Sequence, residues 1–297
     1  MKKISLLLSI FAIAIVSCSK DEVTAPAPAP VLGVLPTRIE NISEGDGNST
    51  ANLTYNGNKI VEYSEPRNSV VYKTVFTYNG DLIVKGESFK GSVLEDSDEY
   101  IYENNKIKTI LSLENRIDYQ TNLPYVEKTK KVYTYNTNGT ILEEQFKLVD
   151  GVYENQNRTK LFTYNSTGNL IKSEENSRSS YFNGTTDVVT TSNYTYTYEY
   201  DNKNNPLKNI TGLNKIGFSD TFSVNNVIKK TSTFSSTNDG VINPNPQPAR
   251  VSEYVLLYNA NDYLTENKYS YNSAVYPPGG GTPTIVIKTN ITRYFYD

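Results

Sequence analysis

Residues 75–88 read VFTYNGDLIVKGES, which is one run of strand-forming residues, a short turn and a second such run. Val, Thr, Tyr and Ile dominate both runs, and all four suit a pleated surface. The Asn-Gly pair between the runs supplies the positive φ angles that tight hairpin turns require. The stretch therefore predicts a β-hairpin whose tip lies at Asn79 and Gly80.

Nearly the same phrase recurs along the chain, as NLTYNGNKIVEYSE at 52–65, VYTYNTNGTILEEQ at 132–145 and LFTYNSTGNLIKSEE at 161–175. The shared token is Tyr-(Asn/Asp/Glu)-x-x-(Gly)-x-(Leu/Ile), and its copies start at Tyr55, Tyr78, Tyr102, Tyr135, Tyr164, Tyr200 and Tyr258. A degenerate copy surrounds Val224, and a truncated copy ends the chain at Tyr296. Such repeats predict two strands per unit, with loops of variable length between units.

Side chains alternate along the strands that enter the tokens. In SNYTYTYEYD, residues 192–201, the four tyrosines Tyr194, Tyr196, Tyr198 and Tyr200 share one face. No segment was found to keep the apolar spacing of a helix over three turns. We therefore expect an all-β fold, an antiparallel meander of about 16–18 strands built from β-hairpin repeats and curled into an open or closed barrel-like sheet. Closure would remove exposed edges.

The N-terminus, MKKISLLLSIFAIAIVSCSKDE, has the layout of a secretory signal, with two lysines and an apolar run from Ile4 to Val16. The run is too short to span a bilayer. It resembles a lipoprotein signal with IVSC as the lipobox, which implies cleavage before Cys18 and lipidation of Cys18. The alternative is an ordinary signal peptide with an incidental cysteine.

The residues after Cys18 predict a tether. SKDEV, residues 19–23, resembles the acidic segment that sends some lipoproteins to the outer face of the outer membrane, which implies a surface-exposed location, with a periplasmic one as the alternative. TAPAPAPV, residues 24–31, favours an extended spacer. We expect residues 1–17 to be a signal peptide, 18–36 the lipidated cysteine and Pro-rich tether, and 37–297 the β-hairpin repeat domain.

Composition excludes several kinds of chemistry. The chain has no histidine, and Cys18 is its one cysteine, so the folded body has no Ser-His-Asp triad, thiol nucleophile or disulfide. Removing Lys2 and Lys3 with the signal leaves 27 basic residues (29 minus 2) against 32 acidic ones. This acidic balance argues against a nucleic-acid partner. We expect no enzyme activity, no catalytic residues, no cofactor and no metal.

Two features have competing interpretations. Glu95, Asp96, Asp98 and Glu99 in LEDSDEY are either calcium ligands or a solvated charge run in a loop between hairpins, and the second is favoured. The tyrosine row of residues 194–200 either binds glycans or extended peptides, or simply stabilises the sheet. The loops NPNPQPAR (243–250) and YPPGGGTPT (276–284) are predicted at the end opposite the token tips, and are the first place to expect a partner.

Two family resemblances follow from these residues. The tokens YNGDLI, YNTNGTI and YNSTGNLI resemble YD/RHS repeats. The lipobox, linker and Tyr/Asn/Thr-rich hairpins together are similar to secreted bacterial lipoproteins that carry a domain of unknown function with a porin-like fold. Neither resemblance brings catalytic residues. A membrane-embedded barrel is disfavoured because charged residues are spread over both strand faces, namely Glu62, Lys85, Lys108, Glu143 and Lys172.

The leading hypothesis is a non-catalytic β-repeat lipoprotein that is held to the membrane by its lipid and acts as a structural or binding module. One alternative is a carbohydrate- or calcium-dependent surface-binding protein that uses the Tyr-rich face. Another is an RHS-type shell fragment.

Overall fold

The computed structural model describes residues 33–44, 47–242, 247–275 and 284–296, which all belong to one unit of residues 32–297. The predicted signal peptide, Cys18 and residues 19–32 lie outside the described residues. The described chain forms seventeen strands and two short helical turns, so the prediction of an all-β fold with about 16–18 strands is confirmed.

The strands of the first half are β1 (Pro36–Ser43), β2 (Gly47–Asn56), β3 (Lys59–Arg67), β4 (Val70–Asn79), β5 (Leu82–Lys90), β6 (Val93–Glu103), β7 (Lys106–Ile117), β8 (Pro124–Tyr135) and β9 (Ile141–Val149). The second half contains β10 (Val152–Tyr164), β11 (Leu170–Phe182), β12 (Asp187–Tyr200), the helical turns α1 (Leu213–Ile216) and η1 (Asp220–Phe222), β13 (Val227–Asn238), β14 (Val241–Ile242), β15 (Arg250–Tyr258), β16 (Leu264–Val275) and β17 (Thr284–Tyr296).

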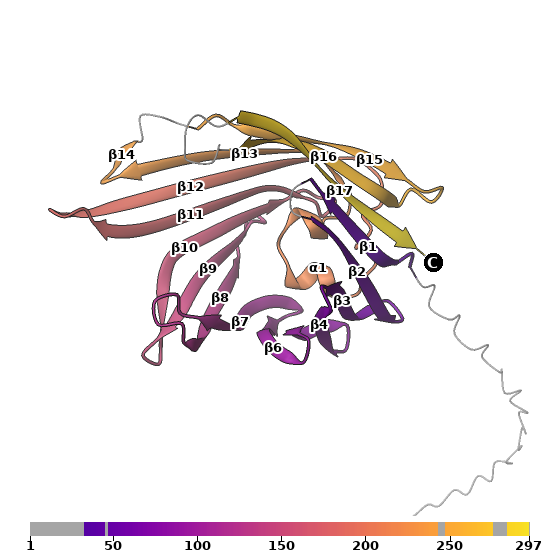
Figure 1. Ribbon diagram of the computed structural model, residues 1–297, viewed down its shortest axis with the longest axis horizontal. Coiled ribbons are helices and arrows are strands. Elements are labelled where there is room, and N and C mark those ends of the chain that lie inside the picture. The colour runs from indigo at the N-terminus through magenta and orange to yellow at the C-terminus, as the bar shows by residue number, and fades with distance from the viewer. Residues whose placement is uncertain (1–32, 45–46, 243–246, 276–283, 297) are drawn as a thin grey trace, which may run out of the picture. The chain divides into compact units, whose positions relative to one another are not determined.

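The sheet closes on itself (Figure 1). Successive strands pair antiparallel from β1 to β13 and from β15 to β17, β13 pairs with β15, and β1 pairs with both β2 and β17. Sixteen strands therefore form a barrel, and the two-residue β14 pairs with the end of β13 beside it. Of the two arrangements left open by the sequence, the structure has the closed one.

Each Tyr token marks the end of an entering strand, as predicted. Tyr55, Tyr78 and Tyr102 are the second-last residues of β2, β4 and β6, and the strand register shifts directly before each of them. The following turn uses positive φ angles, at Gly57 (61°) and Gly80 (56°) among others. The register shift is a β-bulge, in which one extra residue stands on the strand that leaves the turn.

The tyrosine of a token also joins neighbouring hairpins. In three tokens its hydroxyl donates a hydrogen bond to the backbone oxygen of a Leu or Ile at the start of the exit strand of the preceding hairpin. This bond runs from Tyr102 to Ile83 (2.7 Å), from Tyr200 to Leu170 (2.7 Å) and from Tyr296 to Leu264 (2.6 Å). A phenylalanine could not make this bond, which gives a physical reason for the repeated tyrosine.

The inner and outer faces of the barrel wall carry different side chains. Apolar side chains such as Ile83, Ile107 and Tyr133 are buried inside, toward the end where the tokens lie. The outer face carries ion pairs within or between strands. Among them are Lys73–Glu62 (3.7 Å), Lys85–Glu87 (2.6 Å), Lys172–Glu174 (2.8 Å), Lys229–Glu199 (3.0 Å) and Arg293–Glu266 (2.9 Å). No helix of the described residues is long and apolar enough to cross a membrane.

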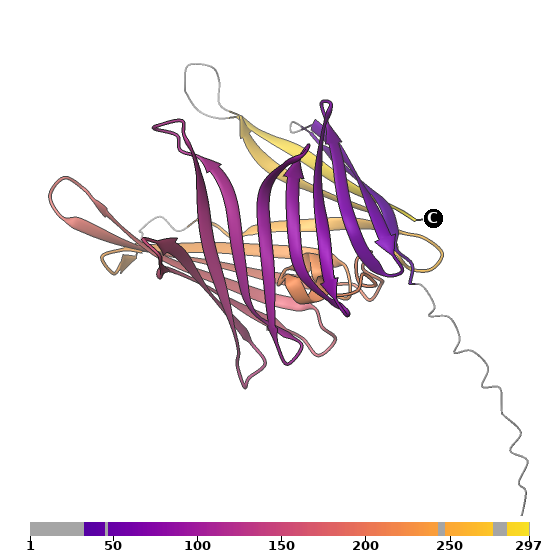
Figure 2. The ribbon, with the colours of Figure 1, turned by 90° about the horizontal axis from the view of Figure 1, so that it is seen from below.

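Residues 201–226, between β12 and β13, form a plug inside the barrel (Figures 1 and 2). The first and last residues of the plug are joined by a backbone hydrogen bond, in which Asp201 N donates to Asn226 O (3.0 Å). Ile210 and Leu213 of the plug are buried in the core. The ring of Phe218 lies 4.9 Å from that of Tyr133 and 5.3 Å from that of Phe162.

The plug binds the hairpin turns at the token end. Thr211 N donates to Asn58 O (2.9 Å), and the Tyr78 hydroxyl donates to Thr211 O (3.1 Å). On the other side, Leu170 N donates to the buried Ser223 hydroxyl (3.1 Å), and Asn225 N donates to Asn169 Oδ1 (3.0 Å). These contacts hold the plug across the token end of the barrel.

The sequence predicted a token copy around Val224 and no plug. Strand β13 does begin next to this copy, at Val227, but the turn before it has become a folded insertion. A signal was present, because Leu207, Ile210, Leu213 and Ile216 recur at three-residue spacing, which is typical of helical turns. This apolar spacing extends over fewer than three helical turns, which is too short to predict a helix from the sequence.

Candidate functional site

The candidate site is the half of the barrel interior farther from the plug. Exposure of the inward-facing side chains rises along the strands with distance from the plug. On β12 it rises from 8% at Tyr198 to 40% at Tyr194, and on β8 from 2% at Tyr133 to 43% at Tyr125. The interior is therefore closed at the token end and accessible to solvent at the opposite end.

The predicted tyrosine row faces this interior. Tyr194 and Tyr196 pair across the strands with Phe234 and Ser232 of β13, while Tyr200 is fixed near the plug through its hydroxyl. Burial raises the pKa of Tyr198 to about 12, and the carboxylate of Asp220 in the plug adds to this rise. The row thus has a structural part at the plug and a more accessible part at Tyr194 and Tyr196.

Aromatic rings line one side of the open half. The rings of Tyr194 and Phe234 lie 4.5 Å apart, and Tyr269 lies 5.2 Å from the ring of Tyr254, which is nearer the plug. Tyr271, the next inward residue on β16, is 6.0 Å from Tyr269. Aromatic faces of this kind bind the apolar faces of ligands while their hydroxyls stay hydrated.

A pocket of about 340 Å³ lies against this aromatic side. Its lining includes Tyr194, Tyr196, Phe234, Gln247 and Arg250. Gln247 and Arg250 belong to the described part of the loop that the sequence singled out for partner contact. Arg250 is exposed and forms no ion pair with any residue that the structure describes, and a guanidinium suits a planar anionic group of a ligand.

Charged side chains line the other side of the open half, on β7 to β11. They form inward-facing pairs, namely Arg116 with Glu114 and Glu127, Lys147 with Glu127, and Arg158 and Lys160 with Glu175. A hydrogen bond to Glu127 raises the pKa of the Lys147 ammonium. The interior therefore offers an aromatic surface facing an ion-pair network.

The acidic cluster does not lie in a loop, which corrects the prediction. Strand β6 contains it entirely, because the turn before that strand is made by Gly91, with φ 62°. Asp98 faces inward, where it accepts a hydrogen bond from Ser112, whereas Glu99 lies opposite Lys85 in the strand register, on the outer face. Burial, followed by the charge of Glu95, raises the pKa of Asp96.

Because neighbouring residues of a strand point to opposite faces, the four carboxylates cannot converge on one calcium ion. Throughout the described residues, no three His, Cys, Asp or Glu side chains come together to hold a metal ion. The calcium-dependent alternative therefore has no site in this cluster.

Sequence reasoning singled out the tyrosine row and the loop with Gln247 and Arg250, but it missed Phe234 and the way these parts come together. Phe234, Gln247 and Arg250 belong to no token and show no motif, and they meet Tyr194 because β13 and β15 pair beside β12. The alternation of β13, with Phe234 opposite Tyr194, is the one signal that indicates an inward-facing aromatic residue there.

Comparisons with known proteins support the fold. No protein-family model matches the chain, and no curated protein sequence matches it. Among solved structures, a porin-like protein from Bacteroides vulgatus matches with a TM-score of 0.51 and 11% sequence identity, over 89% of this chain and 99% of that chain. Another porin-like protein, from Bacteroides uniformis, matches with a TM-score of 0.45 and 12% identity, over 88% and 98% of the two chains.

At 11% identity, the first likeness shows the fold alone. The predicted similarity to a porin-like fold is therefore confirmed at that level. The resemblance to YD/RHS repeats, and with it the RHS-type shell alternative, stays a prediction.

Proposed function

We propose that this protein is a lipid-anchored β-barrel of the bacterial envelope that binds an acidic oligosaccharide in the open half of its interior and has no catalytic role. The observation that carries the proposal is the pocket of about 340 Å³ in which Tyr194, Phe234 and the unpaired Arg250 come together. Its volume falls in the range of small-molecule sites.

The chemistry of the pocket suits a sugar acid. The rings of Tyr194 and Phe234, whose planes are tilted by 39°, provide apolar contact area for a sugar ring, and Gln247 provides amide donors and acceptors. Arg250 offers a planar guanidinium that pairs with a carboxylate or sulfate through two parallel hydrogen bonds. An extended peptide without acidic side chains could pack on the aromatic surface, but it would leave the Arg250 guanidinium without an anionic partner.

The outer face supports anchoring by lipid instead of insertion of the barrel. Ion pairs such as Lys85–Glu87 and Lys229–Glu199 lie on the wall that would face hydrocarbon. A lysine or arginine at the centre of a bilayer costs a transmembrane barrel roughly 2–4 kcal/mol. Attachment through Cys18 avoids this cost, and acyl chains contribute about 0.8 kcal/mol per buried methylene.

The tether joins the barrel at its plugged end. Strand β1 begins at Pro36 beside the token turns, and Gly33 N donates to Asn58 Oδ1 (3.3 Å) at the same end. A lipid on Cys18 is thus connected to the closed end of the barrel.

The first experiment tests the ligand. Incubating the unlipidated domain, residues 33–297, with a glycan array should retain carboxylated or sulfated oligosaccharides. Arg250→Gln and Tyr194→Ala should each weaken binding of the retained glycan by about tenfold or more, because each removes one anchoring contact. Arg178→Gln and Thr195→Ala, which change outward-facing residues of β11 and β12, are matched controls and should bind like the wild type. Silence across the array, or equal binding by all four variants, would contradict the proposal.

The second experiment tests the anchor. In the full chain expressed in a diderm bacterium, Cys18→Ser should move the protein from the membrane fraction to the soluble envelope fraction, and incorporation of labelled fatty acid should be lost. Ser17→Ala, next to it, keeps a small residue before the cysteine and should remain in the membrane fraction. Membrane association of Cys18→Ser equal to that of the wild type would overturn the lipid anchor and leave the glycan experiment unaffected.

A further inference from the structure

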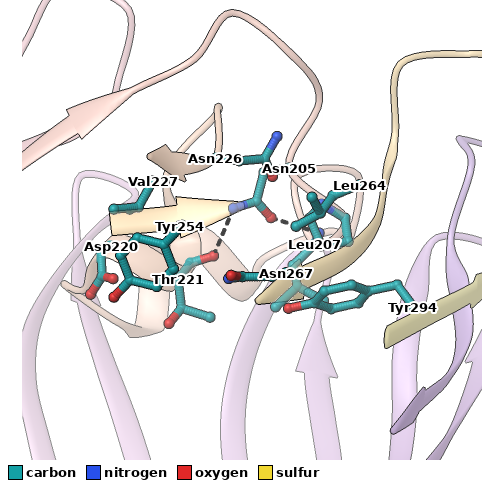
Figure 3. Close-up of a pocket in the computed structure, with 11 residues that line it drawn as sticks. Asn205, Leu207, Asp220, Thr221, Asn226, Val227, Tyr254, Leu264, Asn267 and Tyr294 are labelled. Atoms are coloured by element: carbon teal, nitrogen blue, oxygen red, sulfur yellow. Dashed lines mark hydrogen bonds between the residues drawn. The ribbon is translucent and has the colours of Figure 1, made fainter. Parts of the chain in front are cut away.

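A second cavity, of about 100 Å³, lies between the plug and strands β15 to β17 (Figure 3). Asn205, Asp220, Thr221 and Asn226 line it from the plug. Tyr254, Asn267 and Tyr294 line it from the barrel wall, one from each of the three strands. Thr221 is exposed, so the cavity has a route to solvent.

Hydrogen bonds in the plug fix one side of the cavity. Asn205 Nδ2 donates to Thr221 O (3.1 Å), and Leu207 N donates to Asn205 Oδ1 (2.8 Å), as the dashed lines in Figure 3 show. Asn226 is 3% exposed, and its Nδ2 donates to both carboxylate oxygens of Asp201 (3.4 and 3.2 Å). This orients the Asn226 amide, so its Oδ1 is the atom left over.

Two buried acceptors of the cavity lack a partner. Asn226 Oδ1 and Asn267 Oδ1 are both shielded from solvent, and neither accepts a hydrogen bond from the described residues. A buried polar atom without a partner costs roughly 1–3 kcal/mol, which indicates that something absent from the protein chain satisfies it. Tyr294 reaches from β17 toward Asn267 in Figure 3, and burial raises the pKa of Tyr294 to about 12.

The cavity also contains an unpaired negative charge. None of the ion pairs of the described residues includes Asp220. Its carboxylate lies close enough to Tyr254 to contribute, after burial, to a rise of that tyrosine's pKa to about 12. Lys230, the inward-facing cation of β13, places its ammonium 4.9 Å from the Tyr196 ring centre and 5.5 Å from that of Tyr198 instead.

A group that donates hydrogen bonds and carries positive charge complements these two oxygens and the Asp220 carboxylate. An ammonium group has three donors and no acceptor, which matches one carboxylate and two unpaired amide oxygens. The rings of Tyr254 and Tyr294 add cation–π attraction, which is stronger at sites removed from water. The volume is that of about three water molecules, enough for an ammonium with a short alkyl stem.

We propose that this cavity binds a small primary ammonium group, held by the Asp220 carboxylate and the amide oxygens of Asn226 and Asn267 between the rings of Tyr254 and Tyr294. The site is separate from the glycan pocket, so the two proposals can fail independently.

Isothermal titration calorimetry of the unlipidated domain with ethylammonium tests the site at constant ionic strength. Saturable binding is expected for ethylammonium and not for ethanol, which has the same number of heavy atoms without the charge. Asp220→Asn keeps the shape of the side chain and should weaken binding about tenfold or more, since it removes a charge-assisted hydrogen bond. Asp187→Asn, at the start of β12, removes a carboxylate elsewhere and should bind like the wild type.

A second variant keeps the test valid if Asp220→Asn loses binding only because it fails to fold. Asn267→Asp adds a second carboxylate at one of the unpaired oxygens and should bind ethylammonium more tightly than the wild type. Absence of saturable heat with the wild type, equal affinity of Asp220→Asn and the wild type, or no gain for Asn267→Asp would each overturn the proposal. Displacement of ethylammonium by an equal concentration of potassium would also overturn it, because the site would then be one for simple monovalent ions.

Discussion

The barrel is expected to unfold cooperatively as the pH rises from about 10 to about 12. Its interior is built on buried tyrosines, and burial raises the pKa of Tyr100, Tyr133 and Tyr198 above the usual value of about 10. The nearby carboxylates of Asp98, Glu143 and Asp220 respectively add to these shifts.

The sign of the effect follows because the tyrosines lose their protons at lower pH in the unfolded chain than in the folded barrel. Below about pH 10 these tyrosines are protonated in both the folded and the unfolded chain, so their contribution to stability is fully present. Above that pH the unfolded chain ionises while the folded barrel does not, and the contribution is lost as the pH rises through the folded pKa. Each buried tyrosine then lowers the free energy of unfolding by about 1.4 kcal/mol per pH unit.

The expected size of the effect is comparable with the whole stability of a domain. Tyr100, Tyr133 and Tyr198 together remove roughly 4 kcal/mol per pH unit, or roughly 8 kcal/mol over two units, against a usual stability of about 5–15 kcal/mol. The half-buried token tyrosines add to this loss. Because the chain has no tryptophan, tyrosinate absorbance reports the ionisation directly, and circular dichroism at the same pH values reports the strands.

Two variants distinguish buried from exposed tyrosines. Tyr198→Phe should reduce the slope of unfolding free energy against pH above about 10 by about 1.4 kcal/mol per unit. Tyr119→Phe, which changes a fully exposed tyrosine in the β7–β8 loop, should leave the slope unchanged. Complete tyrosinate formation near pH 10 in a barrel whose circular dichroism does not change would show that these rings are accessible, contrary to the structure.

The local parts of the fold could be predicted from the sequence because their causes are local. A token such as Tyr78-Asn79-Gly80 specifies its own turn, and the alternation on either side specifies which side chains share a face. The acidic segment was misplaced for the same reason, since the Gly91-Ser92 turn before it matches no token. Because this turn was not predicted, the four carboxylates of β6 were predicted to lie in a loop.

Closure and the binding pocket depend on contacts between distant segments, which the sequence pattern does not contain. An open and a closed sheet have the same alternation, and the deciding contact pairs Pro36 at the start of the first strand with Tyr296 at the end of the last. Likewise, Arg250 meets Tyr194 only through the strand order β12, β13, β15. The tyrosine row was predictable, whereas its division into a part fixed by the plug and an accessible part was not.

Gly212 is expected to be a sensitive residue of the plug, because the plug passes the backbone of the β4–β5 turn there with no room for a side chain. Its φ is +80°, and a Cβ atom at this position would lie 2.8 Å from Asp81 O and 3.3 Å from Ile83 N. Both of these atoms are backbone atoms of the barrel wall, so neither can move aside as a flexible side chain would. Gly212→Ala should therefore push the plug away from the buried Ile83 as well as strain its own backbone.

Gly240 provides a matched control, since its φ is +81° and nothing lies within 4 Å of an added Cβ. Gly240→Ala should cost only the strain of a left-handed residue, about 1–2 kcal/mol. Gly212→Ala should cost more, roughly 3 kcal/mol or above, because the strain is joined by an overpacked contact worth about 1–3 kcal/mol. Urea unfolding monitored by circular dichroism measures both, with the midpoint compared at constant slope. Equal midpoints for the two variants would mean that the plug can leave the token end without loss, and that the barrel interior is not closed there by residues 201–226.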